Sequence, residues 1–224
     1  SLKNLTSGGG NVAVGYTALD AVVGGSHNVA IGYEALTAAP GNASHNVAIG
    51  RDALKAHNVD GDGNNVAIGS EAGAAVTSGT NNVIVGTGAV KTATTVSKVV
   101  AIGGNAMLGA DASDTHEGTV AVGYGALGAE DTDSGNTAIG HQALLVQDGG
   151  ASNVAVGRSA GNAVSTGDEN VLLGTQAGDE ITTGSSNIVI GFRAEVAAAG
   201  NDNSIVIGTG ADGAGSNTTV IGTG

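Results

Sequence analysis

The stretch Asn28-Val29-Ala30-Ile31-Gly32 recurs in close variants along almost the whole chain. Thirteen copies occur in the 224 residues, the first at 11–15 and the last ending at Gly222. Successive closing glycines are 17, 18, 19, 17, 17 and 20 residues apart, then 17 five times, and finally 14. A period of this kind is the signature of a repeat architecture, in which each repeat packs against its neighbours.

Each repeat predicts a short strand followed by a tight corner. Val29 and Ile31 lie two residues apart, so they point to one face of an extended strand and Ala30 points to the other. The glycine permits a turn, and the apolar runs are too short for helices. We therefore predict an all-β fold, a parallel β-solenoid (β-roll) of about thirteen coils with a period near 17 residues. Residues 1–10 would be an N-terminal cap or linker, and residues 11–224 one solenoid domain.

The middle residue of each strand indicates an oligomer. A strand position that faces water should be polar. This one is Ala in eight copies, and in the other five it is Ile84, Leu172, Val189, Val206 and Val220. We therefore expect both faces of the strand to be buried. One face would pack inside the coil, and the face that carries the middle residue would pack against another chain. We expect a homotrimer in which the coils meet about a threefold axis.

An asparagine opens nine of the thirteen copies. Amides stacked at one corner can hydrogen-bond to the backbone and to one another from coil to coil. We therefore predict a structural ladder rather than a ligand site. Its members are Asn11, Asn28, Asn46, Asn65, Asn82, Asn136, Asn153, Asn170 and Asn187.

Composition excludes several classes of function. The formal net charge of −13 argues against nucleic acid and against an anionic membrane surface as partners. No apolar run is long enough to cross a bilayer, so we expect no membrane insertion. The absence of cysteine excludes disulfides and thiolate metal sites. Neither a nucleophile–base grouping nor a phosphate-binding loop is legible, so we expect no enzyme and no cofactor.

Two weak metal hypotheses remain open. Residues 60–64 and the carboxylate that follows have part of the spacing of a calcium loop, but Asn65 stands where that loop has Gly, and no flanking helix is predicted. The candidate ligands are Asp60, Asp62, Asn64 and Glu71.

His27 and His45 hold equivalent places in their repeats and should stack one coil apart. Imidazoles clustered by symmetry could bind a transition metal. With no carboxylate partner apparent at that position, exposed corner histidines are the simpler interpretation, and we expect no bound metal.

Extra residues relative to the 17-residue period collect at 37–44, 55–64 and 110–118, all between the Ala-Leu position and the next strand. Insertions gathered on one face of a solenoid often mark its binding face. Tyrosine, which suits glycan or protein contact, follows the closing Gly in three copies. The candidate receptor contacts are Pro40, Asp60, Asp62, Asp111, Asp114, His116, Glu117, Tyr16, Tyr33 and Tyr124.

The fuller phrases at 11–19 and 28–36 resemble the head repeats of trimeric autotransporter adhesins. They are even more similar to the Gly-Tyr-x-Ala-Leu repeats of bacteriophage tail fibres and related virion proteins. The resemblance covers about residues 11–222 and implies a trimeric β-roll that attaches to surfaces; it carries no catalytic residues. The adhesin repeats are usually shorter, and neither a neck nor a heptad stalk is visible here, so the resemblance favours a phage fibre.

The resulting expectation is a non-enzymatic, extracellular fibre segment on a virion or cell surface. Its partners would be two further copies of the chain, a bacterial surface glycan or protein receptor, and other fibre or virion proteins at its ends. The alternatives are a bacterial trimeric adhesin head, a self-stacking structural filament and an ice-binding solenoid. A spike that cleaves glycans would use a carboxylate pair, with candidates Asp111, Asp114, Glu117, Glu130, Asp131 and Asp133.

Overall fold

The computed structural model describes residues 2–38, 41–110, 117–129 and 135–222. The chain divides into two compact units, Ser1–Gly118 and Thr119–Gly224. The described residues contain thirteen strands of three residues each. The first unit holds β1 (Val12–Val14), β2 (Val29–Ile31), β3 (Val47–Ile49), β4 (Val66–Ile68), β5 (Val83–Val85) and β6 (Val100–Ile102). The second holds β7 (Val120–Val122), β8 (Thr137–Ile139), β9 (Val154–Val156), β10 (Val171–Leu173), β11 (Ile188–Ile190), β12 (Ile205–Ile207) and β13 (Thr219–Ile221).

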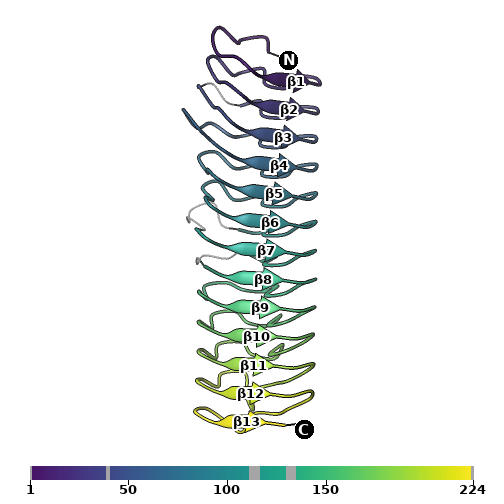
Figure 1. The fold of residues 1–224 in the computed structure, drawn as a ribbon, viewed down its shortest axis with the longest axis vertical. Helices are drawn as coiled ribbons and strands as arrows, with labels where there is room; N and C mark the ends of the chain where they lie inside the picture. The colour runs from purple at the N-terminus through teal and green to yellow at the C-terminus, as the bar shows by residue number, and fades with distance from the viewer. Residues whose placement is uncertain (1, 39–40, 111–116, 130–134, 223–224) are drawn as a thin grey trace. The chain divides into compact units, whose positions relative to one another are not determined.

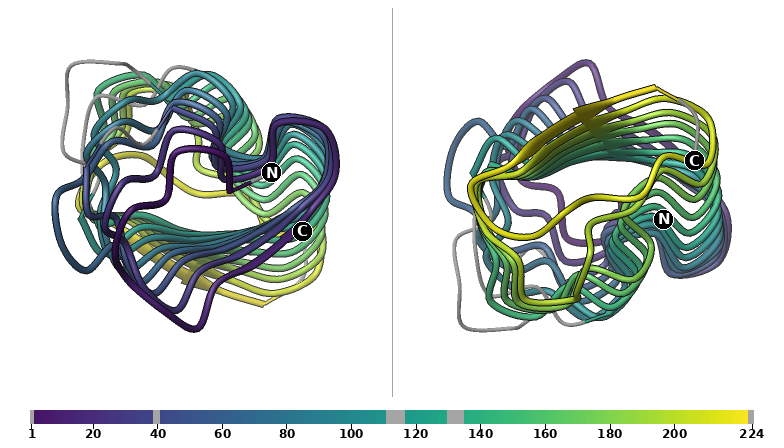
Figure 2. Two further views of the ribbon diagram at one scale, coloured as in Figure 1. Left: turned by 90° about the horizontal axis from the view of Figure 1, so that it is seen from above. Right: turned by 90° about the horizontal axis from the view of Figure 1, so that it is seen from below.

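Each unit is a parallel β-solenoid with one strand per coil (Figure 1). Within a unit every strand pairs in parallel with the strands before and after it in the chain, and equivalent residues lie opposite one another, as Ala13 lies opposite Ala30. The coils of each unit overlie one another around one interior (Figure 2). In the regular coils the register partners are 17 residues apart, as are Val154 and Val171. The predicted fold class and period are confirmed.

The middle residue of each strand points into the coil. Ala30, Ala48 and Ile84 have no exposed surface in the single chain, whereas the two residues that flank each of them are partly exposed. The expectation that the middle residue contacts another chain is therefore wrong. Alternation gives the strand two faces, and the middle residue lies on the face that packs inside the coil, whether it is Ala or a larger residue such as Ile84.

The interior is filled by pairs of side chains whose sizes compensate. Four residues after the closing Gly the chain places a buried Leu, such as Leu36, and the middle residue of the next coil is then Ala48. Where that fourth position is Gly73, the next middle residue is Ile84. A Cβ added to Gly73 would lie only 3.1 Å from the Ile84 Cδ1. Large and small residues thus alternate to keep the interior close-packed.

The closing glycine is required by the distance between coils. Gly15, Gly32 and Gly50 all have φ near +135°, in the region that favours glycine (133°, 137° and 134°). A Cβ on Gly15 would collide with the carbonyl oxygen of Gly32 in the next coil, and the same holds for Gly32 and Gly50. A side chain at this position would therefore force neighbouring coils apart.

Residues other than glycine also adopt left-handed backbone at the corners. Glu34 and Leu36 have φ values of 53° and 50°. Val90, which is β-branched, has a φ of 48°. Such conformations cost about 1–3 kcal/mol each and persist only where surrounding contacts impose them. The buried side chain of Leu36 provides that constraint at its corner.

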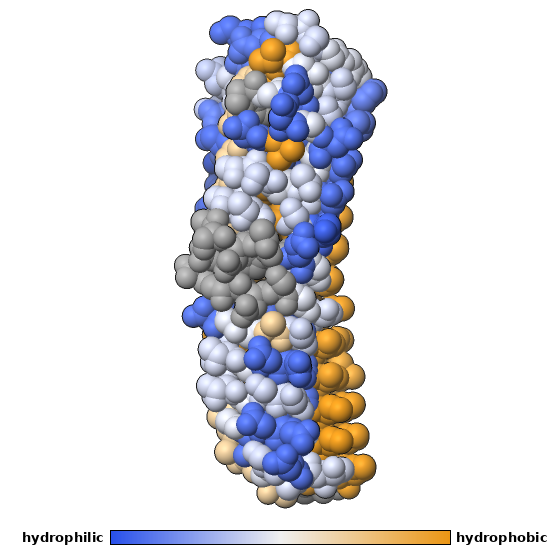
Figure 3. Space-filling view, turned by 90° about the vertical axis from the view of Figure 1, so that its left-hand side faces the viewer, coloured by the Kyte–Doolittle hydropathy of each residue, from blue (hydrophilic) through white to orange (hydrophobic). Residues whose placement is uncertain are grey.

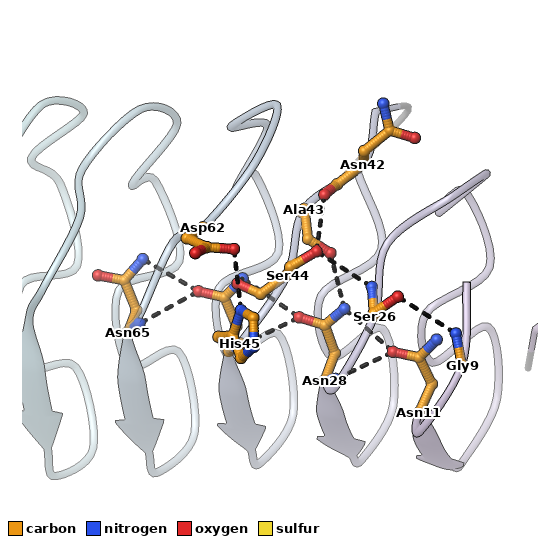
Figure 4. Close-up of polar contacts among 11 residues, drawn as sticks. Gly9, Asn11, Ser26, Asn28, Asn42, Ala43, Ser44, His45, Asp62 and Asn65 are labelled. Atoms are coloured by element: carbon orange, nitrogen blue, oxygen red, sulfur yellow. Dashed lines mark hydrogen bonds and ion pairs between the residues drawn. The ribbon is translucent and has the colours of Figure 1, made fainter. Parts of the chain in front are cut away.

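The predicted asparagine ladder is present in both units, and Figure 4 shows part of it in the first unit. The Asn28 backbone N–H donates to Asn11 Oδ1 at 2.9 Å, and the Asn28 side-chain amide donates to the Ala43 carbonyl at 2.7 Å. The ladder satisfies backbone groups that lie in the interior, as buried polar groups require. The nine asparagines are Asn11, Asn28, Asn46, Asn65, Asn82, Asn136, Asn153, Asn170 and Asn187.

A second ladder, which the sequence interpretation missed, lies two residues before the first. The Ser26 backbone N–H donates to Ser44 Oγ at 3.1 Å, and the Gly9 N–H donates to Ser26 Oγ at 3.2 Å. In the second unit the Ala151 N–H donates to Asp168 Oδ1 at 2.8 Å. The contacts of Gly9 also show that residues before β1 hydrogen-bond to the following coil, as does the Thr6 N–H to the Val23 carbonyl.

Candidate functional site

The outward face of the strands carries a row of exposed valine and isoleucine side chains. In the first unit Val14, Ile31 and Ile68 are 58%, 36% and 38% exposed. In the second unit Ile139 and Val156 are similarly exposed. Orange side chains line the right-hand edge of the lower part of Figure 3, where the second unit lies. In each unit we call this row the outward apolar face. Single exposed apolar residues need no explanation, but a contiguous row marks an interaction surface.

The residue after each closing Gly forms an exposed row beside the strands. Tyr16 stacks on Tyr33 with ring centroids 5.4 Å apart, and Tyr124 stacks on His141 at 5.6 Å. Phe192 lies against the Arg193 guanidinium, 5.3 Å from its ring centroid. All three predicted receptor tyrosines are exposed, so they are available for contact.

His27 and His45 stack as expected, with ring centroids 5.2 Å apart. His45 has a carboxylate partner after all, because its Nδ1 lies 2.9 Å from Asp62 Oδ1 (Figure 4). The sequence interpretation missed this contact because two extra residues in the 55–64 loop displace Asp62 from the repeat position where a partner was sought. Within the described part of the chain, no group of three or more His, Asp or Glu residues could hold a metal ion.

Three of the four calcium candidates, Asp60, Asp62 and Glu71, have other partners. Asp60 Oδ1 accepts hydrogen bonds from the Asn42 backbone N–H at 3.1 Å and from its side-chain amide at 2.8 Å. Glu71 pairs with Arg51 from the preceding coil and with Lys91 from the following coil. The structure therefore does not bring Asp60, Asp62, Asn64 and Glu71 together around one point.

The predicted contacts in the inserted loops are described only in part. Glu117 forms an isolated bridge with Ser97 and an ion pair of 3.0 Å with Lys98. Pro40, Asp111, Asp114 and His116 lie outside the described residues, as do the glycosidase candidates Glu130, Asp131 and Asp133.

A chain of alternating charges crosses the corner of coils two to five in the first unit. Lys55 Nζ lies 2.6 Å from Glu34 Oε2 and 3.3 Å from Asp52 Oδ1. Arg51 bridges Asp52 and Glu71, and Lys91 Nζ lies 2.5 Å from Glu71 Oε2. Lys55 lowers the pKa of Glu34, and Lys91 with Arg51 lowers the pKa of Glu71. We call these six residues the charged corner.

An open cavity of about 320 Å³ lies at the charged corner. It is lined by two lysines, two carboxylates and two alanines, which are Asp52, Lys55, Glu71, Ala74, Ala75 and Lys91. Sequence reasoning did not find this site, because its residues come from three coils. The sequence did contain a pattern that could have indicated the site. Its acidic residues stand two residues after the closing Gly of their repeats, and its lysines stand five residues after it.

Two further titratable groups are shielded from water. His57 is fully buried, and burial lowers the pKa of its imidazole to about 4. In the second unit, burial raises the pKa of Glu195 to about 8, and the nearby Asp179 adds to the shift. Glu195 also accepts a hydrogen bond from the Asp179 backbone N–H at 2.8 Å. These groups couple the stability of each unit to pH rather than forming a site.

No protein-family model matches the sequence, and no curated protein matches it either. Among the described residues, no helix is long and apolar enough to span a membrane. The functional argument therefore rests on the surfaces of the molecule itself, together with the repeat phrase.

Proposed function

We propose that the chain is a non-enzymatic structural and adhesive fibre segment, which assembles as a homotrimer and attaches to a bacterial surface. The observation that supports it best is the outward apolar face, which places two apolar side chains in register in every strand except β8 and β13, where one of the two is threonine. A bacteriophage tail fibre or its receptor-binding region is the source that the Gly-Tyr-x-Ala-Leu phrase favours. The fibre is then extracellular, and other virion proteins adjoin its ends.

Self-association explains why both flanking positions stay apolar. Burial of apolar surface stabilises an interface by about 25 cal/mol per Å². One pair of side chains contributes little, but the face repeats its pair in β2, β3, β4 and β6 with Val and Ile. When three copies meet at a symmetry axis, their outward apolar faces are removed from water and the assembly is closed. The resemblance to trimeric fibre repeats is the reason for choosing three copies.

Attachment then follows from multivalency. Three weak sites held on one assembly bind a surface far more tightly than one, because binding of the first raises the effective concentration of the others. The exposed tyrosines Tyr16, Tyr33 and Tyr124 and the described part of the inserted loops are the proposed contacts. A bacterial adhesin head would use the same surfaces. The proposed mode of attachment is therefore the same whether the fibre comes from a phage or from a bacterium.

The test is binding of fluorescently labelled protein to a panel of bacterial strains. The proposal expects saturable binding to some strains, competed by unlabelled protein. It also expects a large loss of avidity when the assembly is dissociated by substitutions in the outward apolar face. Absence of binding to every strain of a broad panel, or equal binding by the dissociated variant, would contradict the adhesive role.

A further inference from the structure

The cavity of the charged corner arises from one missing side chain in a repeated row. Five residues after the closing Gly the row reads Lys55, Ala74 and Lys91 in coils three, four and five. Each lysine reaches back to the carboxylate of the preceding coil, as Lys91 does to Glu71 and Lys55 to Glu34. Because Ala74 is short, the space between the two lysines stays open, with Ala75 beside it.

The walls of this cavity offer both donors and acceptors. Lys91 Nζ lies 2.5 Å from Glu71, and as an ammonium it carries three protons, so it can donate to a ligand without leaving that carboxylate. Asp52 is only 8% exposed, and its Oδ1 pairs with Lys55 Nζ at 3.3 Å.

The balance of charges restricts the ligand. The charged corner contains three of the seven cationic residues of a chain whose net charge is −13. Asp52 and Glu71 would repel a phosphate dianion, but they are good acceptors for hydroxyl groups. The two lysines favour one carboxylate, and the alanine methyls can contact the apolar side of a ring. A ligand with one carboxylate, several hydroxyls and a ring meets all these conditions.

We propose that this cavity binds a carboxylated sugar unit of a surface polysaccharide, with the sugar carboxylate between Lys55 and Lys91 and its hydroxyls on Asp52 and Glu71. The volume of about 320 Å³ lies at the small end of the range of ligand pockets and suits one or two sugar rings. This inference rests on the proposed function, because it names the receptor chemistry of the fibre.

The experiment is calorimetric titration of the full chain with galacturonic acid oligomers and with galactose oligomers of the same length. The acidic oligomer is expected to bind at least about tenfold more tightly, since each charge-assisted contact contributes on the order of 1.5–3 kcal/mol. Lys91→Gln removes one such contact and should weaken binding by about tenfold or more. Equal binding of the neutral oligomer, or competition by inorganic phosphate at similar concentration, would overturn the assignment.

Ala74→Leu tests the shape of the cavity without changing charge. Leu108 occupies the same row one coil beyond Lys91, so the fold tolerates leucine at this position. The substitution should abolish binding while the circular dichroism spectrum stays unchanged. Lys98→Gln is the matched control, because Lys98 pairs with Glu117 outside the cavity, and it should leave affinity within about twofold. Wild-type affinity in Ala74→Leu would refute the site.

Different results would refute the cavity assignment and the proposed trimeric fibre. The cavity lies within one chain, so sugar binding can be measured whether or not the protein forms trimers. A trimer that attaches to bacteria but ignores acidic oligomers would refute the cavity assignment alone. A monomer that binds acidic oligomers would refute the trimeric fibre and leave the cavity assignment intact.

Discussion

Asn28 Oδ1 accepts a hydrogen bond from the Asn46 backbone N–H, 3.0 Å away in the next coil. The same contact links Asn153 to Asn170 in the second unit at 2.9 Å. Each asparagine thus satisfies an interior backbone group of its successor, while its own amide donates to a carbonyl three residues before that successor, as Asn153 Nδ2 does to the Gly167 carbonyl at 2.7 Å. The repeat phrase opens with Asn because no other side chain of that length both donates and accepts.

Asn153→Ala should destabilise the second unit strongly. It leaves the Asn170 N–H and the Gly167 carbonyl buried without partners, and each such group costs about 1–3 kcal/mol. We expect a loss of about 2–4 kcal/mol in the free energy of unfolding, measured by urea denaturation. Asn153→Ser is the control, because Ser204 holds this row naturally and its Oγ donates to the Gly215 carbonyl. A loss below about 1 kcal/mol for Asn153→Ala would show that the ladder is dispensable.

Gly161 and Leu172 should behave as a coupled pair. A Cβ on Gly161 would collide with Leu172 Cδ1, so Gly161→Leu alone should cost at least about 1–3 kcal/mol through overpacking. Leu172→Ala alone should cost about 2–5 kcal/mol through the cavity that it leaves. The double variant restores the combination that Leu36 and Ala48 form in the first unit. Additive losses in a double-mutant cycle would contradict the size compensation, and a double variant more stable than the sum would support it.

Val90→Leu should stabilise the first unit. Val90 is β-branched at a φ of 48°, whereas the equivalent residues Leu36 and Leu54 carry the same backbone with an unbranched Cβ. Relief of this strain, with no lost burial, should raise the free energy of unfolding by about 0.5–1 kcal/mol. The reverse change in the second unit, Leu127→Val, should lower it by more than the roughly 0.8 kcal/mol of one methylene group. Urea denaturation of both variants checks the two signs.

Stability of the second unit should fall as pH rises from about 4.5 to about 8. Burial raises the pKa of Glu195 from its ordinary 4.5 to about 8, so the folded state holds the proton more tightly than the unfolded state. The stabilisation by this proton is therefore full below pH 4.5 and is lost as pH approaches 8. Glu195→Gln should flatten the profile of urea midpoint against pH. Glu180→Gln, which removes the same charge at an exposed neighbour, should leave the slope in place.

The sequence predicted the strand that contains Ala30 and Ile31, but it did not predict which of these two side chains faces the interior. The spacing of 17 residues and the strand–glycine phrase predicted the solenoid, because identical residues in identical register admit one stacking. Period-two alternation separates Ala30 from Ile31 but does not say which faces the interior. That depends on the thickness of the coil, which the buried side chain of Leu36 fills from the opposite wall.

The candidate site was less accessible from sequence than the ladder. Asn28 and Asn46 hold the same repeat position, so their contact followed from the period alone. The cavity depends on Ala74 being short between two lysines, and the His45–Asp62 contact depends on the path of an inserted loop. Such sites come from departures from the repeat, and a periodic pattern does not predict where a departure places its side chains.

The most direct test of the account is the solution mass of the chain, measured by light scattering across a dilution series. We predict three times the mass of one chain, independent of concentration over the series. Threonine stands at the first outward position of two strands, as Thr137 and Thr219, without loss of the strand, so the triple variant Val29→Thr, Val47→Thr and Val66→Thr at the same position should keep its circular dichroism and lose the trimer. A wild-type mass of one chain at every concentration, or a mass that grows without limit, would contradict the closed trimer built on the outward apolar face.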